Sequence, residues 1–161
     1  MMRPRVIQRV VRFGILLGVV LAAAMFLRTW SRSRIPEADH SMEPTYPAGT
    51  RVLTKPLAPE APLDRGTDVV YRMEKDGTTY ERFGRVRALP GDEVGARDGM
   101  LTVNGEPIGP IAIPGEAMGT VPEGRVLILA INPLEETYPD SRKIGFIRRE
   151  DVLFLIRAGM P

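Results

Sequence analysis

The sequence predicts a mainly β domain that follows one N-terminal transmembrane helix. An apolar run near the N-terminus, Phe13 to Leu27, contains 15 residues without a charge. Beyond it, short runs rich in branched residues alternate with turn residues, which is typical of antiparallel sheets. Sixteen glycines and 15 prolines divide the chain into short elements, because proline interrupts helices and central strands.

The apolar run is expected to form a membrane-spanning helix over residues 7–30. A span needs about 20 residues, and the charges of Arg12 and Arg28 can reach the two interfaces while their stems lie in hydrocarbon. Residues 1–6 then form an arginine-rich tail and residues 31–38 a linker. Gly14 and Gly18 have the G-x-x-x-G spacing that lets a second helix approach closely.

A cleaved signal peptide is the alternative for this segment. Ala22-Ala23-Ala24 offers the small residues of a cleavage site. However, Met25-Phe26-Leu27 continues the apolar run beyond them. We therefore expect an uncleaved anchor.

The charges divide the chain into two regions. The first 36 residues contain seven arginines and no acidic residue, whereas residues 37–161 contain 15 basic and 20 acidic residues. The basic region suits anionic lipid head groups, and the acidic remainder does not suit nucleic acid. With no cysteine, one histidine and no clustered carboxylates, we expect no disulfide, no metal site and no cofactor.

Three segments have the composition of strands: residues 51–54, 68–72 and 125–131. Lys75-Asp76-Gly77 and Asn104-Gly105 are typical hairpin turns. Residues 151–156 fit either a closing strand or a short helix. The region after residue 38 is therefore expected to be a β domain.

Three motifs follow one another in the order of a known family. They are Ser41-Met42-Glu43-Pro44, then Leu89-Pro90-Gly91-Asp92, then Asp140-Ser141-Arg142 with Gly145. Together they resemble the type I signal peptidases, serine peptidases that trim secretory precursors with a Ser–Lys dyad. The resemblance covers residues 39–156 and implies a signal-peptidase-I-like β domain over residues 39–161. It also implies that Ser41 holds the nucleophile position and that Asp140 and Arg142 form a structural ion pair.

The chain departs from that family at its catalytic residues. Gly84 stands where the family has its general-base lysine, and Tyr138 replaces a serine that hydrogen-bonds to this lysine. Asp39 replaces a small residue that supports the oxyanion hole, and Ala130-Ile131 replaces Gly-Asp. A serine hydroxyl needs a base to become a nucleophile, and an ionised Asp39 would repel a developing oxyanion.

Other side chains are poor candidates for a replacement base. Neighbours on an extended segment point to opposite faces, so His40 is expected to point away from Ser41. Lys55, Lys75 and Lys143 lie in turns or polar stretches. Arginine side chains stay protonated and cannot accept the proton.

These observations predict a membrane-anchored, catalytically inactive protein that acts as a structural or accessory subunit of a larger membrane complex. Its partners would be membrane lipids and other membrane-protein subunits. Two alternatives stay open: an active Ser-dependent signal peptidase with a displaced base, which would bind a peptide substrate, and a peptide-binding module that does not cleave. The resemblance implies an inner (cytoplasmic) membrane location with a cytoplasmic N-terminus and a periplasmic domain. The flanking arginines, four before the span and three after it, are too evenly divided to set this orientation.

Overall fold

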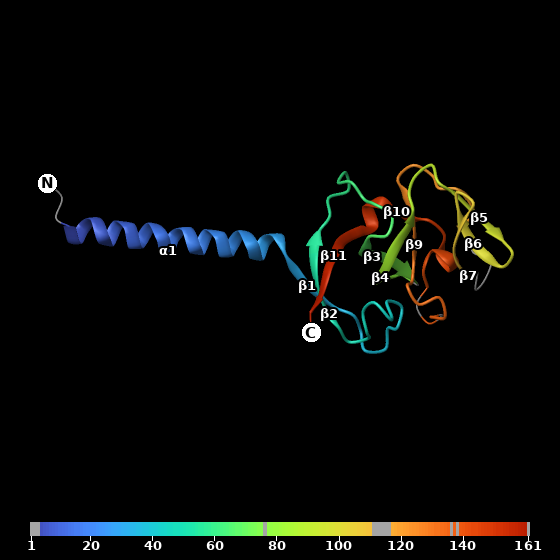
Figure 1. Cartoon of the computed structure of the whole chain (residues 1–161), viewed down its shortest axis with the longest axis horizontal. Helices are drawn as coiled ribbons and strands as arrows, with labels where there is room; N and C mark the ends of the chain where they lie inside the picture. The colour runs from blue at the N-terminus through green and yellow to red at the C-terminus, as the bar shows by residue number, and fades with distance from the viewer. Residues whose placement is uncertain (1–3, 76, 111–116, 136, 138, 161) are drawn as a thin grey trace. The chain divides into compact units, whose positions relative to one another are not determined.

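The computed structural model describes residues 4–75, 77–110, 117–135, 137 and 139–160. The chain divides into two units, residues 1–31 and residues 32–161. The first unit contains helix α1, Pro4–Thr29. The second is built from strands (Figure 1).

Helix α1 covers most of the segment that was expected to span a membrane. Its side chains from residue 11 to residue 25 are exposed. In the part of the chain that the structure describes, however, no helix is both long enough and apolar enough to cross a membrane. The span expected over residues 7–30 therefore stays a prediction.

The second unit contains two antiparallel sheets. The larger has the strand order β1-β2-β11-β3-β4-β9-β10 and the smaller the order β7-β6-β5-β8. The strands of the larger sheet are β1 Ser31–Arg34, β2 Arg51–Pro56, β3 Asp68–Lys75, β4 Thr78–Ala88, β9 Arg125–Leu129, β10 Ile147–Arg148 and β11 Val152–Met160. The smaller sheet contains β5 Glu93–Arg97, β6 Met100–Val103, β7 Glu106–Pro110 and β8 Gly119–Thr120. Two short helical turns, α2 Ser141–Ile144 and η1 Arg149–Asp151, complete the unit.

The expected mainly β architecture is therefore confirmed. The turn at Asn104-Gly105 joins β6 to β7, and both residues have positive φ angles, 52° and 82°, as a two-residue hairpin turn requires. Strands β3 and β4 also form a hairpin, with Lys75 opposite Thr78. Strand β1 lies within the segment that was expected to be a linker. The segment after residue 150 combines both expected alternatives, because η1 leads directly into β11.

Three clusters of buried side chains form the core. One lies around Val69, Tyr71, Val86 and Ile128 in the larger sheet. A second joins β9 to the smaller sheet through residues such as Val94 and Leu101. In the third, Met42 is fully buried against Val52, Val70 and Phe83, so the loop that carries Ser41 is fixed to the sheet by its neighbouring methionine.

An ion pair between the first residues of the β3–β4 ladder fixes the register of these strands. Asp68 lies opposite Arg85 and accepts hydrogen bonds from its Nε at 2.6 Å and its Nη2 at 2.9 Å. The Tyr46 hydroxyl donates a third bond to Asp68 at 3.1 Å. The same register places Gly84 opposite Val69, next to this pair.

We predict that Asp68→Ala lowers the free energy of unfolding by about 2–3 kcal/mol, because it leaves a half-buried guanidinium without its acceptor. Urea unfolding of the full chain measures this change. The matched control is Glu37→Ala, which removes an ion pair with Arg34 whose side chains are 79% and 56% exposed and should change the stability by less than about 1 kcal/mol. Equal effects of the two substitutions would contradict the structural role of Asp68.

Candidate functional site

Ser41 lies in the loop that precedes β2, and its backbone is bonded on both sides. Its N–H donates to Asp39 Oδ1 at 2.9 Å. Its carbonyl accepts from the N–H groups of Ile131 at 2.7 Å and Asn132 at 2.9 Å. The peptide bond between Glu43 and Pro44 in the same loop is cis. These hydrogen bonds hold the segment after β9 against the loop that carries Ser41.

The side chains of Ser41 and Asp39 are both buried. Ser41 is 3% exposed and Asp39 is 1% exposed. Among the described residues, neither Ser41 Oγ nor Asp39 Oδ2 has a hydrogen-bond partner. A nucleophilic serine needs a base within about 2.6–3.2 Å of its oxygen. This arrangement supplies no proton acceptor to Ser41 from the described side chains.

The space beside Gly84 is filled by two neighbouring side chains. A Cβ atom on Gly84 would lie 2.5 Å from Ile128 Cγ2, 3.2 Å from the carbonyl oxygen of Leu129 and 3.3 Å from Tyr71 Cε1. Ile128 is fully buried and Tyr71 is 1% exposed. Ile128 has few side-chain conformations available because it is branched at Cβ. A lysine at position 84 therefore does not fit unless the core moves.

Tyr71 contributes a buried hydroxyl near the same place, which the sequence analysis did not identify. It donates to the carbonyl of Pro139 at 3.4 Å. Burial raises the pKa of Tyr71 well above its usual value, and the negative charge of Asp140 adds to this effect. The phenol is therefore neutral at physiological pH. Tyr138, which was expected to replace the lysine's hydrogen-bond partner, lies outside the described residues.

The sequence contained a pattern that could have identified Tyr71 as a neighbour of Gly84. A glycine inside a buried strand leaves a volume that its neighbours must fill, because protein interiors are close-packed. Tyr71 is the largest side chain in the expected strand 68–72. Its orientation toward Gly84 depends on the hairpin register, however, and the sequence did not define that register.

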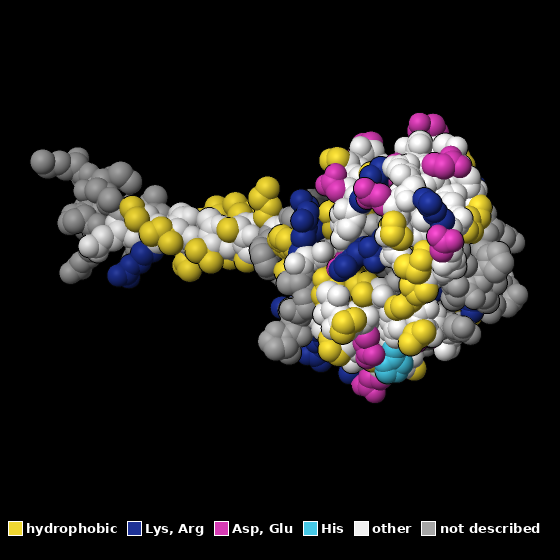
Figure 2. All heavy atoms as spheres, turned by 45° about the vertical axis from the view of Figure 1, so that its right-hand side comes forward, with side chains coloured by type: hydrophobic (Ala, Val, Ile, Leu, Met, Phe, Trp, Pro, Cys, Tyr) yellow, Lys and Arg dark blue, Asp and Glu magenta, His cyan; other side chains and the backbone are white. Residues whose placement is uncertain are grey.

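The side chain of His40 forms its hydrogen bond with Glu43. Its Nδ1 lies 2.9 Å from Glu43 Oε1, and the histidine side chain is 51% exposed. Figure 2 shows this histidine at the surface beside acidic side chains. The hydrogen bond with Glu43 is the main reason why the pKa of His40 is raised. Its expected orientation away from Ser41 agrees with this contact.

Of the lysines considered as replacement bases, Lys55 and Lys143 form no hydrogen bond with Ser41 Oγ. Among the described residues that oxygen has no hydrogen-bond partner. Lys55 is exposed on β2, and Lys143 is exposed on α2. The side chain of Lys75 lies outside the described part of the chain.

Asp92 forms the centre of the tight turn that contains Pro90 and Gly91. Gly91 has a φ angle of 86°, a left-handed conformation that glycine adopts without strain. Burial by itself would raise the pKa of Asp92, but hydrogen bonds to its carboxylate outweigh this effect and lower the pKa. The donors are the Leu89 N–H, the Arg65 guanidinium and the Asn104 amide. Asp92 thus joins three chain segments and has a structural role.

Asp140 organises the segment that follows β9. Its Oδ2 accepts from the Ala130 N–H at 2.8 Å and lies 2.9 Å from Arg142 Nη2. Asp140 also caps α2 by accepting from the Arg142 N–H, and Gly145 ends that helix with a φ angle of 80°. Arg142 Nη1 donates to the carbonyl of Pro133 at 2.8 Å. The ion pair implied by the family resemblance is thus present and holds residues 130–133 in place.

No group of three or more histidine or carboxylate side chains that could hold a metal ion occurs among the described residues. The described side chains with ionisable or nucleophilic groups around this position are the Ser41 hydroxyl, the Asp39 carboxylate and the Tyr71 phenol. Of these only the carboxylate is a base, and its one bonded oxygen accepts a backbone N–H.

We predict that the single histidine titrates with an NMR midpoint above 6.5, since its hydrogen bond with Glu43 favours the protonated form. Glu43→Gln should return the midpoint toward 6.5. The interaction with Glu43 is complete at pH values above the lowered pKa of Glu43 and below the usual pKa of histidine, and it is lost as the pH rises through the raised pKa of His40. An unchanged midpoint in the variant would contradict this pairing.

We also predict that Gly84→Ala lowers the free energy of unfolding by about 1–3 kcal/mol, because its new methyl group overlaps Ile128. The matched control is the same substitution in an Ile128→Ala background, where the nearest obstructing atom is gone. The loss caused by Gly84→Ala should be smaller there, as measured by urea unfolding in a double-mutant cycle. Equal losses in the two backgrounds would show that Ile128 does not fill this space.

Comparison with known proteins assigns the family. A family model described as "Signal peptidase, peptidase S26" matches residues 7–158. No curated protein matches the chain. Among the solved structures, a signal peptidase I from Enterococcus faecalis V583 matches with 20% identity and a TM-score of 0.43, covering 63% of this chain and 98% of the other. The family match extends over nearly the whole chain, and the chain therefore belongs to the signal peptidase family, peptidase S26.

Proposed function

We propose that this protein is a non-cleaving member of the signal peptidase family. The observation that supports this most strongly is the state of Ser41, whose Oγ is buried and has no hydrogen-bond partner among the described residues. The space beside Gly84, where the family lysine would begin, is filled by Ile128 and Tyr71. A substrate carbonyl would have to reach an oxygen that is both covered and unactivated.

The role that suits such a protein is that of a structural or accessory subunit of a membrane complex. Loss of the base alone would leave a cleft that could still hold a peptide. Here Ser41 and Asp39 are buried, so the end of the cleft that would hold the scissile bond is closed. This favours a scaffold over a module that binds a peptide against the serine. Leu134, 83% exposed in the segment after β9, offers an apolar contact for a partner subunit.

An active enzyme with a displaced base is the rival, and Asp39 is its best candidate. Its Oδ2 is buried and unpartnered, two residues from the nucleophile position. Its Oδ1, however, accepts the N–H of Ser41, and a carboxylate at this place opposes the negative charge of an acyl-transfer intermediate. The geometry thus favours the inactive protein.

We predict that the purified protein and its Ser41→Ala variant release product from a signal-peptide substrate at the same background rate. Mass spectrometry of the reaction products measures this directly. Asp39→Asn is the matched variant for the rival base. Cleavage by the wild type that is lost in both variants would overturn the proposal and identify an aspartate-assisted enzyme.

Gly84→Lys by itself should not restore cleavage, because the new side chain meets Ile128 and Tyr71 while Asp39 still opposes the oxyanion. A variant that adds Ile128→Ala and Asp39→Ser supplies both space and a hydroxyl donor, and should regain measurable cleavage. Strong cleavage by the single Gly84→Lys variant would show that the site is open, contrary to the proposal.

We further propose that α1 attaches the protein to a membrane, with the β domain outside the lipid. The support is the row of exposed apolar side chains, including Phe13 at 69%, Leu16 at 64% and Val20 at 61%. Their exposure to water is unfavourable, and lipid would cover them. A Cβ atom on Gly14 or Gly18 would meet nothing within 4 Å, so both positions are open to a second helix.

We predict that Leu16→Arg with Val20→Arg releases the full chain from liposomes in a flotation assay, since charged side chains are costly in hydrocarbon. The control is Gly14→Ile with Gly18→Ile, which keeps the apolar surface and should float like the wild type while losing any partner helix. Undiminished flotation of the arginine variant would exclude α1 as the lipid contact.

A further inference from the structure

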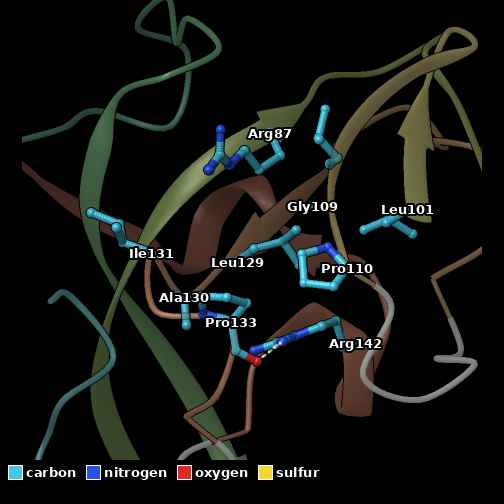
Figure 3. Close-up of a pocket in the computed structure, with 10 residues that line it drawn as sticks. Arg87, Leu101, Gly109, Pro110, Leu129, Ala130, Ile131, Pro133 and Arg142 are labelled. Carbon is cyan, nitrogen blue, oxygen red and sulfur yellow. Dashed lines mark hydrogen bonds between the residues drawn. The ribbon is translucent and has the colours of Figure 1, made fainter. Parts of the chain in front are cut away.

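A cavity of about 160 Å³ lies between the two sheets. Its walls come from β4, β6, β7, the end of β9, the segment 130–133 and α2 (Figure 3). Most of the lining is apolar and includes Leu101, Ile108, Leu129 and Ile131. The proposed loss of cleavage assigns no role to this cavity.

Two arginines line the cavity, and they differ in how their charge is compensated. Arg142 is 11% exposed and paired with Asp140 at 2.9 Å, and it also donates to the Pro133 carbonyl. Figure 3 shows this bond on one side of the cavity and Arg87 on the opposite side. The charge of Arg142 is thus already satisfied within the protein.

The surroundings of Arg87 are different. Its Nε is buried and has no hydrogen-bond partner among the described residues. Burial lowers the pKa of Arg87 first, repulsion by Arg85 lowers it further, and the attraction of Asp68 is the weakest of the three effects. Asp68 is itself bonded twice by Arg85. Because guanidinium stays charged, this half-buried group places a positive charge at an apolar cavity, and its Nε has no partner among the described residues.

We propose that this cavity binds a carboxylate carried on a short branched apolar group, with Arg87 holding the carboxylate and the apolar walls covering the rest. Guanidinium and carboxylate match in geometry and form charge-assisted hydrogen bonds. The size fits as well, since a cavity of about 150 Å³ holds a molecule as large as benzene. A C-terminal leucine or valine of a peptide and a free branched acid share this chemistry.

The alternative that Arg87 binds any small anion is less well supported. A site for phosphate or sulfate presents several polar donors around the ion, whereas the other charged side chain of this cavity is already paired with Asp140. The apolar lining contributes favourable energy only to a ligand that carries apolar surface. The composition of the walls therefore selects an amphipathic carboxylate.

The test uses the full-length protein in a neutral detergent, titrated with N-acetyl-leucine, N-acetyl-leucinamide, 4-methylpentanoate and inorganic phosphate. Calorimetry or NMR shift changes to about 10 mM probe suit ligands of this size. We expect both carboxylates to bind at least about tenfold more tightly than the amide or phosphate. Tighter binding of N-acetyl-leucine than of 4-methylpentanoate would identify a peptide C-terminus as the ligand source, and the reverse order a free acid.

Arg87→Gln should reduce carboxylate binding about tenfold or more, whereas Arg97→Gln, which changes a 79% exposed side chain, should leave it unchanged. If Arg87→Gln fails to fold by circular dichroism, the comparison of carboxylate with amide on the wild type still decides. Equal binding of acid and amide, preference for phosphate, absence of binding, or equal loss in both variants would each overturn the proposal.

Discussion

Gly84 on β4 and Ile128 on β9 approach so closely that no side chain can extend from position 84 without moving the core. The added Cβ would meet Ile128 Cγ2 at 2.5 Å, and Ile128 is held by full burial among the residues of the larger sheet. Tyr71 closes the same space from β3. If position 84 is where the family has its lysine, as the sequence resemblance implies, the chain lacks the room for that side chain as well as the side chain itself. Neighbouring residues pack into the volume that a lysine would use, and the buried state of Ser41 is consistent with this closure.

Three buried carboxylates stabilise the domain around position 84. Asp68 fixes the register of β3 and β4 through Arg85, Asp92 joins the β4 turn to Arg65 and Asn104, and Asp140 holds the segment after β9. The oxygens of each of these carboxylates accept hydrogen bonds from specific donors, as buried charges require. Asp39 differs, because one of its buried oxygens has no partner among the described residues. The contrast separates Asp39 from the carboxylates that support the fold.

Several features could be predicted from the sequence because each depends only on the residues of one short segment. Asn104-Gly105 predicts a hairpin turn from its tolerance of positive φ angles, and branched runs predict β2, β3 and β9 in place. The motif residues Asp140 and Arg142 were expected to pair, and their spacing at the start of α2 brings them together. The roles of Tyr71, Ile128 and Arg87 could not be predicted in this way. They depend on which strands pair and in what register, including the irregularity between Val86 and Ala88 where Arg87 lies.

Ser41 is covered, and its Oγ has no hydrogen-bond partner among the described residues. A fluorophosphonate reagent tests this most directly, since it forms a covalent adduct only with a serine that is both accessible and activated. Intact-mass analysis of the folded wild type and the Ser41→Ala variant after incubation with the reagent should show the same low background of modification in both. A stoichiometric adduct that maps to Ser41 in the wild type and is absent from Ser41→Ala would contradict this account.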